Sequence, residues 1–567
     1  MSEPMIEIEN LSVKYDAQAE VTLKDINLVI NHGEKILIAG PSGSGKSTFS
    51  RVLNGLIPHA FPGQVTGTIK IAGQDVTTSD VFARSLQIGT VLQDSNAQFV
   101  GLTTAEDLAF TLENDAVDHP TMLAQVKKWA EELQLTELLD LAPQVLSGGQ
   151  KQRVAMGGVL IDDSPILLFD EPLASLDPAS GYRMMQLLNR IQTLENLTVI
   201  IIEHRLEEIL QTGVDKVVIL DEGQIVFEGT AREVLLENKL TTYGLSTPAY
   251  LQILHAAGVD FSTIANLEEP AKITAPAIRD QVLAYQATLP ENSPQSMTKP
   301  LLEIKNLAFS YPDHRQLFDK LSLTLNEGQI VALVGKNGSG KSTLSQLLVG
   351  FLHESAGEIR WQQEIDLRQL SIKERAEYIG YVAQDPNSMM TQTIIFDEVA
   401  IGLKLRGVPE AEIQAQVYRL LKIAGLYEMR NWPIAVLSYG QKKRLSMLAV
   451  LVLEPKLLIL DEPTAGQDLR HAHEMMDFVQ KLNQELGLTV LIITHDMALM
   501  LAMTARALVL VDGQLLADVA PADLLVNPAL VAQADLRLTS VYTLANALQL
   551  DRPEQLARAL AQGGHDE

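Results

Sequence analysis

The chain repeats itself at a spacing near half its length of 567 residues, and this repeat constrains the fold more than any other feature. The segment GPSGSGKST at 40–48 recurs as GKNGSGKST at 335–343, displaced by 295 residues. LSGGQ, LLFDEP and IIEH recur as LSYGQ, LILDEP and IITH, all displaced by 291 residues. Solenoid repeats are much shorter, roughly 20 to 50 residues. We therefore expect a duplicated whole domain, with each copy folding around its own sheet.

The first copy is expected to span residues 1–235 and the second 300–525. Residues 236–299 contain enough Leu, Ile and Val for appended helices, which we assign to the first domain, and end in a linker-like LPENSPQSMTKP. The apolar spacing of residues 526–567 predicts a helical tail whose final GGHDE is disordered.

Composition excludes several classes of protein. The formal net charge of −27 argues against binding to nucleic-acid phosphates, because that affinity depends on basic side chains. The absence of cysteine excludes disulfides and thiolate metal sites and is compatible with a reducing cytoplasm. The sequence has no secretory signal pattern and no apolar run of about 20 residues. We therefore expect any role at a membrane to be that of a peripheral protein.

Each copy contains a pattern that predicts a phosphate site. A short apolar run leads into a glycine-rich loop and then an apolar-periodic stretch, which predicts strand, loop and helix. Backbone N–H groups of such a loop, with the helix N-terminus, form a cradle for phosphate oxygens; the lysine reaches the terminal phosphates and the next serine binds Mg²⁺. The predicted loop residues are Gly40, Pro41, Ser42, Gly43, Ser44, Gly45, Lys46, Ser47 and Thr48, and Gly335, Lys336, Asn337, Gly338, Ser339, Gly340, Lys341, Ser342 and Thr343.

Two acids follow a buried-type strand in each copy, in ILLFDEP and LLILDEP. Asp170 and Asp461 are positioned to hold Mg²⁺, and Glu171 and Glu462 to polarise an attacking water. Alone, such a pair is more often a strand end with solvated acids. The phosphate loop earlier in each copy favours the catalytic interpretation.

LSGGQ followed by KQR, about 20 residues before the acidic strand, resembles the signature of ABC transporter ATPases. Both halves follow that family's motif order over some 450 residues. The resemblance implies an α/β fold of two P-loop NTPase domains. Each would have a mixed sheet core, a helical signature subdomain and an N-terminal antiparallel β subdomain, with ATP and Mg²⁺ as ligands.

The family resemblance also implies roles for residues that spacing alone leaves open. Taken alone, the tyrosines are as readily core residues, and the histidines packing residues. The implied roles are adenine stacking for Tyr15 and Tyr311, a link from Mg²⁺ and water to the partner subunit for Gln93 and Gln384, and γ-phosphate contact for His204 and His495. In the family two cassettes close head to tail, so Ser147 and Gly149 would complete the site of Lys341, and Ser438 and Gly440 that of Lys46.

The region from Val91 to Asn114 is similar to the ATPases of energy-coupling factor importers. The match is imperfect, because Ser95 replaces an expected proline and Met389 an expected glutamine, so the groove for the membrane subunit is expected to differ between halves. This resemblance implies a peripheral subunit on the cytoplasmic face of the cell membrane. Its partners would be an integral scaffold and a substrate-binding membrane subunit, with uptake of a vitamin-like nutrient such as a thiamine precursor.

Two departures from the family pattern bear on catalysis. Tyr439 replaces a signature glycine, and AGQD around Asp468 stands where the first copy has SLD around Asp177. Both catalytic glutamates and both histidines are present. We therefore hypothesise two hydrolytic sites of unequal rate, with Tyr439 crowding the γ-phosphate that faces Lys46.

The alternative from another class is a ribosome-associated translation factor, because such proteins also carry two cassettes in one chain. Their linker is typically a long basic helical pair. Residues 240–299 instead contain five acidic and three basic residues and several prolines, which is poor for contact with rRNA. A DNA-repair ATPase is further disfavoured, because no zinc module or long coiled-coil insertion is visible.

Overall fold

The structure is a computed structural model that describes residues 3–173, 176–290, 299–312, 316–465, 467 and 469–563. The chain divides into two compact units, Met1–Ala275 and Pro276–Glu567. Asp468, most of the expected linker and residues 564–567 lie outside the described residues. Each unit is described by itself below.

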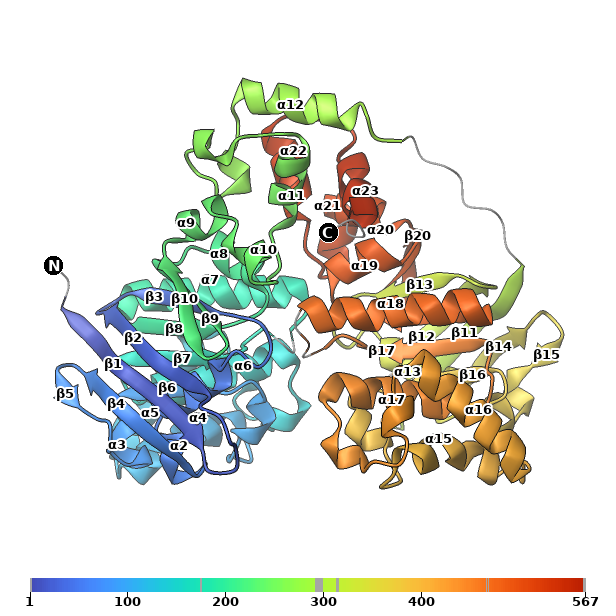
Figure 1. Ribbon diagram of the computed structural model, residues 1–567, viewed down its shortest axis with the longest axis horizontal. Coiled ribbons are helices and arrows are strands. Elements are labelled where there is room, and N and C mark those ends of the chain that lie inside the picture. The colour runs from blue at the N-terminus through green and yellow to red at the C-terminus, as the bar shows by residue number, and fades with distance from the viewer. Residues whose placement is uncertain are drawn as a thin grey trace. The chain divides into compact units, whose positions relative to one another are not determined.

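The first unit contains two sheets (Figure 1). An antiparallel sheet has the order β2-β1-β4-β5, and a six-stranded sheet has the order β10-β9-β3-β8-β7-β6, parallel except for the pair β9 and β10. The strands are β1 Pro4–Tyr15, β2 Leu23–Asn31, β3 Lys35–Ala39, β4 Gly63–Ile71, β5 Gln74–Asp75, β6 Ile88–Val91, β7 Ile166–Asp170, β8 Thr198–Ile202, β9 Lys216–Asp221 and β10 Gln224–Gly229.

The helices of the first unit connect these strands and form a helical subdomain of α4 to α6. Several begin with a side-chain cap that the sequence supplies, such as Thr103 with Glu106 at α4 and Asp177 at α7. The helices are α1 Lys46–Leu53, α2 Leu56–His59, α3 Val81–Ser85, α4 Thr104–Asn114, α5 His119–Glu132, α6 Gly148–Leu160, α7 Pro178–Glu195, α8 Leu206–Gln211, α9 Ala231–Leu236, α10 Lys239–Thr242 and α11 Ala249–Ala256.

The second unit repeats both sheets. Their strand orders are β12-β11-β14-β15 and β16-β17-β18-β13-β19-β20, and only β19 and β20 pair antiparallel in the six-stranded sheet. The strands are β11 Pro300–Ser310, β12 Gln316–Asn326, β13 Ile330–Val334, β14 Ala356–Trp361, β15 Ile365–Asp366, β16 Ile379–Val382, β17 Leu457–Asp461, β18 Thr489–Ile493, β19 Arg506–Val511 and β20 Gln514–Val519. These folds confirm the predicted mixed sheet, antiparallel β subdomain and helical signature subdomain of each copy.

The helices of the second unit include a corresponding subdomain of α15 to α17 and a helical tail after β20. They are α12 Pro276–Gln286, α13 Lys341–Val349, α14 Ile372–Arg375, α15 Ile395–Lys404, α16 Glu410–Ile423, α17 Tyr439–Leu451, α18 Leu469–Leu486, α19 Met497–Met503, α20 Pro521–Leu525, α21 Pro528–Gln533, α22 Ser540–Ala547 and α23 Pro553–Gly563.

Helix α12 belongs to the second compact unit, whereas the sequence analysis assigned the helices expected within residues 236–299 to the first domain. Arg279 Nε donates to the Leu548 carbonyl, and Gln286 Nε2 donates to the carbonyls of Asp551 and Arg552. These contacts tie α12 to the segment between α22 and α23. Composition along the chain could not predict these hydrogen bonds, because their partners lie more than 260 residues apart in the sequence.

The core of each unit fixes the position of the phosphate loop. In the first unit, buried residues of β1, β2 and β4, of α1 and of one face of the six-stranded sheet form a single apolar cluster. Strand β3 is buried along its whole length, so it lies rigidly at the centre of the sheet, and α1 packs where β3 ends. The loop between them is therefore held at both ends by the core.

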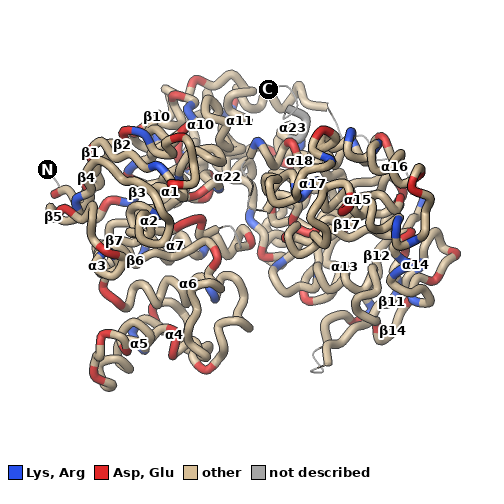
Figure 2. Tube along the Cα trace, turned by 60° about the horizontal axis from the view of Figure 1, so that its bottom comes forward, with Lys and Arg blue, Asp and Glu red and all other residues tan. Residues whose placement is uncertain are grey.

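Acidic residues outnumber basic ones, 71 to 44, and the two kinds are interspersed along the trace of both units (Figure 2). Among the described residues no helix is long and apolar enough to cross a bilayer.

Candidate functional site

In the first unit the predicted phosphate loop lies between β3 and α1, as the sequence indicated. Lys46 is the first residue of α1, and its Nζ donates to the carbonyls of Gly40, at 2.7 Å, and Pro41, at 2.8 Å. The side chain is 6% exposed. The lysine therefore folds over its own loop, with its charge at the helix N-terminus where phosphate oxygens are favoured.

Two glycines of this loop are required by geometry. Gly45 has φ +106°, in the left-handed region that L side chains rarely adopt. A Cβ on Gly40 would lie 2.2 Å from the Leu220 carbonyl oxygen and 2.6 Å from Ser44 Oγ. The corresponding Gly340 has φ +105°, and a Cβ on Gly335 would lie 1.9 Å from the Leu510 carbonyl oxygen. Both loops therefore depend on backbone that only glycine provides, which fits the close approach of a phosphate group.

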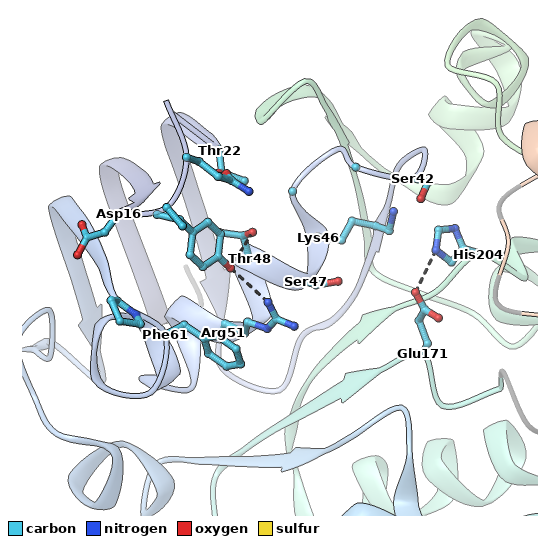
Figure 3. Close-up of a pocket in the computed structure, with 16 residues that line it drawn as sticks. Asp16, Thr22, Ser42, Lys46, Ser47, Thr48, Arg51, Phe61, Glu171 and His204 are labelled. Carbon is cyan, nitrogen blue, oxygen red and sulfur yellow. Dashed lines mark hydrogen bonds and ion pairs between the residues drawn. The ribbon is translucent and has the colours of Figure 1, made fainter. Parts of the chain in front are cut away.

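A cavity of about 890 Å³ joins the residues predicted from separate motifs in the first unit. Glu171 and His204 lie at one end beside Lys46, and Arg51 and Phe61 lie at the other (Figure 3). The guanidinium of Arg51 stacks 4.3 Å from the centre of the Phe61 ring. The cavity thus has a charged end and an aromatic end, as a nucleotide requires.

Tyr15 lines the aromatic part of this cavity. Its hydroxyl lies 3.2 Å from Thr48 Oγ1 and accepts from Arg51 Nη1 at 3.4 Å. In the second unit the Tyr311 hydroxyl lies 2.7 Å from Thr343 Oγ1, and the ring packs edge-on against Phe309. Both tyrosines are therefore fixed beside the helix that starts at the phosphate loop.

The carboxylate of Glu171 is held from both sides. Its Oε1 lies 3.0 Å from His204 Nε2, and its Oε2 accepts from Gln93 Nε2 at 2.6 Å. Burial would raise the pKa of Glu171, but the His204 and Gln93 hydrogen bonds and the nearby Lys46 charge lower it below its usual value. Three residues predicted from three motifs therefore converge on one ionised carboxylate.

The residues predicted to hold Mg²⁺ provide hydroxyl and carboxylate oxygens, which this ion prefers. Asp170 ends β7, where burial raises its pKa, and it is hydrogen-bonded to Ser50. In the second unit Asp461 ends β17, and a hydrogen bond joins it to Ser342, the loop serine. The donor set fits Mg²⁺, and in the second unit the two predicted ligands already lie within hydrogen-bond distance of each other.

The second phosphate loop has the same geometry as the first. Lys341 Nζ donates to the carbonyls of Gly335, at 2.7 Å, and Lys336, at 3.0 Å. The two carboxylates behind the loops differ, however. Glu462 Oε1 lies 3.5 Å from His495 Nε2 and accepts no hydrogen bond among the described residues.

Burial and the neighbouring Asp461 raise the pKa of Glu462 to about 8. Tyr381, which replaces Thr90 of the first unit, donates to Asp461 Oδ2 at 3.0 Å. The pKa of Glu462 is therefore displaced upward in the nucleotide-free chain, whereas that of Glu171 is displaced downward.

The signature segments form helix N-termini. Ser147 caps α6 and Ser438 caps α17, each in a reciprocal capping box with the glutamine three residues later. Gly149 and Gly440 lie in the first turns, and neither has a positive φ. In both units the serine hydroxyl therefore caps its own helix. The prediction that it also binds nucleotide is not tested by this geometry.

The loops around Gln93 and Gln384 have similar backbones despite the two departures noted from sequence. Ser95 and Pro386 each begin a single 3₁₀ turn capped by the preceding aspartate. In the first unit Gln98 Oε1 accepts from Leu92 N at 2.9 Å; in the second, Met389 Sδ takes the same position and accepts from Ala383 N at 3.2 Å.

Tyr439 lies against the loop of its own unit. Its hydroxyl donates to the Gln384 carbonyl at 3.3 Å, and its side chain is 40% exposed. The sequence had suggested only that this ring crowds the phosphate facing Lys46.

Sequence reasoning missed several residues around the sites. In the first unit Glu203 is 2% exposed and accepts hydrogen bonds from the backbone N–H groups of Leu173, His204 and Arg205. It therefore orders the backbone around His204. In the second unit burial lowers the pKa of Lys443 to about 8, although Asp461 and Glu462 oppose that effect. Comparing the two copies position by position would have marked Lys443, because Gln152 occupies its place in the first.

Comparisons with protein families cover more than half of the chain. Residues 23–174 and 318–465 match the family model described as ABC transporter. Residues 237–309, between the two matches, fit a model described as ATP-binding cassette cobalt transporter.

Curated proteins match the chain over nearly its full length. A protein of Lactiplantibacillus plantarum is 51% identical over 98% of both chains, and one of Streptococcus mutans is 48% identical over 100% of both. Each is described as a "Putative ABC transporter ATP-binding protein". The solved structure of cbiO1 from Clostridium perfringens, described as part of the ABC transporter complex cbiONQ, is 33% identical over 42% of this chain and 96% of its own, with a TM-score of 0.39.

Proposed function

The chain belongs to the ABC transporter ATP-binding proteins, and on that premise we propose that it is the energy-coupling subunit of an importer. In this proposal it hydrolyses ATP and drives uptake of a small vitamin-like nutrient through separate membrane subunits. One observation carries the proposal. Lys46, Glu171 and His204 line one cavity, and Gln93 and His204 both hydrogen-bond to the carboxylate of Glu171. The match of residues 237–309 to a transporter model supports the importer class over the ribosome-associated alternative.

The residues of the first site support hydrolysis of a terminal phosphate. The ionised Glu171 lies where it can orient a water, because Gln93 and His204 fix both of its oxygens. Lys46 and the backbone of the loop neutralise phosphate charge, which is the largest contribution that a protein makes to such a reaction. Asp170 and Ser47 would hold Mg²⁺, which would supply further charge neutralisation. In the second site Lys341, Asp461, Ser342, Gln384, Glu462 and His495 take the corresponding roles.

The adenine and signature contacts belong to the same proposal. Tyr15 and Tyr311 stack on adenine, and each signature serine and glycine completes the nucleotide site of the other cassette. The domain division proposed is 1–235 and 300–525 for the cassettes, with appended helices and a linker at 236–299 and a helical C-terminal tail at 526–567. The protein acts at the cytoplasmic face of the cell membrane through an integral scaffold and a substrate-binding subunit.

Affinity purification from native membranes tests the proposal. The full-length protein, tagged and expressed at its natural level, is extracted in mild detergent with ATP, and co-purifying proteins and small molecules are identified by mass spectrometry. We expect integral membrane proteins in stoichiometric amounts. The double variant Glu171→Gln/Glu462→Gln serves as a control that should retain these partners and lose ATP hydrolysis. Recovery with ribosomal proteins and without integral membrane proteins would instead support the translation-factor alternative.

A further inference from the structure

A buried lysine ties two backbone segments together beside the second site. Lys443, on α17, is only 1% exposed. Its Nζ donates to the carbonyls of Ala383, at 3.2 Å, and Glu462, at 3.4 Å, and also to the carbonyl of Gln384. Three carbonyl acceptors match the three N–H donors of an ammonium group. A buried cation is costly unless it is fully hydrogen-bonded, and here it is.

The three carbonyls belong to the two segments that carry the catalytic side chains. Ala383 and Gln384 follow β16, and Glu462 follows β17. Glu462 has φ +47°, a conformation that a non-glycine residue adopts at some cost in energy. By holding the Glu462 carbonyl, Lys443 fixes the peptide plane that follows this strained residue, and thereby its position relative to Gln384.

Tyr439 strengthens the same tie. It lies one turn earlier on α17, and its hydroxyl donates to the Gln384 carbonyl at 3.3 Å. Two side chains of one helix therefore hold one carbonyl oxygen, which has two lone pairs to accept them.

The first unit has no such tie among its described residues. Gly148 and Gln152 occupy the places of Tyr439 and Lys443. Gln152 is 1% exposed, and neither atom of its amide has a hydrogen-bond partner. There the side chain of Gln93 contacts Glu171 directly, whereas Glu462 receives no such bond. The two sites are therefore organised by different contacts.

We propose that Lys443 is a positioning residue of the second ATP site, which with Tyr439 sets the spacing of Gln384 and Glu462 by binding their backbone carbonyls. This inference rests on the proposed ATPase function. It predicts that loss of the lysine slows the chemical step at the second site without weakening nucleotide binding, because no hydrogen bond of Lys443 reaches the phosphate loop or Tyr311.

The test uses the full chain carrying Glu171→Gln, in which the second site alone retains its glutamate. Adding Lys443→Gln, which installs the residue of the first unit, should lower kcat about 10-fold and change the KM for ATP less than twofold, because small displacements of catalytic groups are expensive. Lys481→Gln, which removes the same charge from an exposed position on α18, is the matched control and should leave both constants unchanged. A kcat within twofold of the parent would overturn the proposal.

Two further measurements keep the test decisive. Hydrogen exchange of the nucleotide-free chain should become faster in Lys443→Gln at the backbone amides of Gln384, Asp385 and Glu462. Unchanged exchange at these amides overturns the tie even if no variant hydrolyses ATP. Tyr439→Phe, at a side chain that is 40% exposed and so tolerant of change, should lower kcat about twofold with KM unchanged. A parent with no ATPase activity would refute the proposed function, while the exchange result would still decide the role of Lys443.

Discussion

The opposite pKa displacements of Glu462 and Glu171 predict opposite effects of pH on stability. Burial, with Asp461 nearby, raises the pKa of Glu462 from 4.5 to about 8. Between these values the folded chain retains a proton that the unfolded chain has released, so the free energy of unfolding falls as pH rises. For that pKa displacement the loss is about 4 kcal/mol at pH 8 and about 1 kcal/mol at pH 5.

Glu462→Gln replaces the carboxyl group with a neutral group of the same shape and removes this penalty. The variant should therefore gain about 3 kcal/mol more over the wild type at pH 8 than at pH 5, or about 6 °C in the midpoint of thermal unfolding for a unit of this size. Differential scanning calorimetry of the nucleotide-free chain in EDTA measures the difference.

Glu171→Gln is the matched control, because the same substitution there should act in the opposite direction. His204, Lys46 and Gln93 hold the pKa of Glu171 below 4.5 against the effect of burial. A lowered pKa contributes stability above the unfolded value that is lost as pH falls, so Glu171→Gln should cost stability at pH 8 and less at pH 4. Equal pH profiles for the two variants would refute the raised pKa of Glu462.

Three further predictions follow from single contacts. Tyr15→Ala should raise the KM for ATP about 10-fold through loss of ring stacking, whereas Tyr15→Phe should change it less than twofold. Steady-state kinetics in the Glu462→Gln background measures both. Gly340→Ala should abolish ATP binding by the second unit in equilibrium dialysis, because φ is +105° and the new Cβ would lie 2.7 Å from Phe318 Cε1. Arg84→Met and Arg375→Met should each lower stability by about 3 kcal/mol in calorimetry, because each guanidinium satisfies buried carbonyls at the end of the helix after the phosphate loop.

The sequence predicted most of the architecture because the relevant signals are local. A strand, a glycine loop and a helix follow one another without interruption at Lys46 and again at Lys341, so their relation in space is set by a few backbone angles. Gln93, Glu171 and His204 are far apart in sequence. Each nevertheless follows a strand of one parallel sheet, and the carboxyl ends of such strands meet at one edge.

What the sequence could not predict depends on contacts between distant residues. Nothing in the composition of residues 236–299 shows that Arg279 and Gln286 bind carbonyls near residue 550. The Lys443 tie is also invisible to motif reading, since a lysine in a helix that begins with a signature motif is normally exposed. The packing of α17 against β16 and the 3₁₀ turn at Pro386–Met389 buries it.

The differences between the two sites converge on one region. Tyr381, Tyr439 and Lys443 replace Thr90, Gly148 and Gln152, and all three contact Asp461 or the backbone of Gln384 and Glu462. These three side chains hydrogen-bond to adjacent groups. The two phosphate loops keep the same lysine-to-carbonyl hydrogen bonds, although Lys336 and Asn337 replace Pro41 and Ser42. Both units keep the glycines and the lysine of the nucleotide cradle, whereas the hydrogen bonds to the catalytic carboxylate differ. We therefore predict that the two sites hydrolyse ATP at unequal rates and that the difference arises in the chemical step.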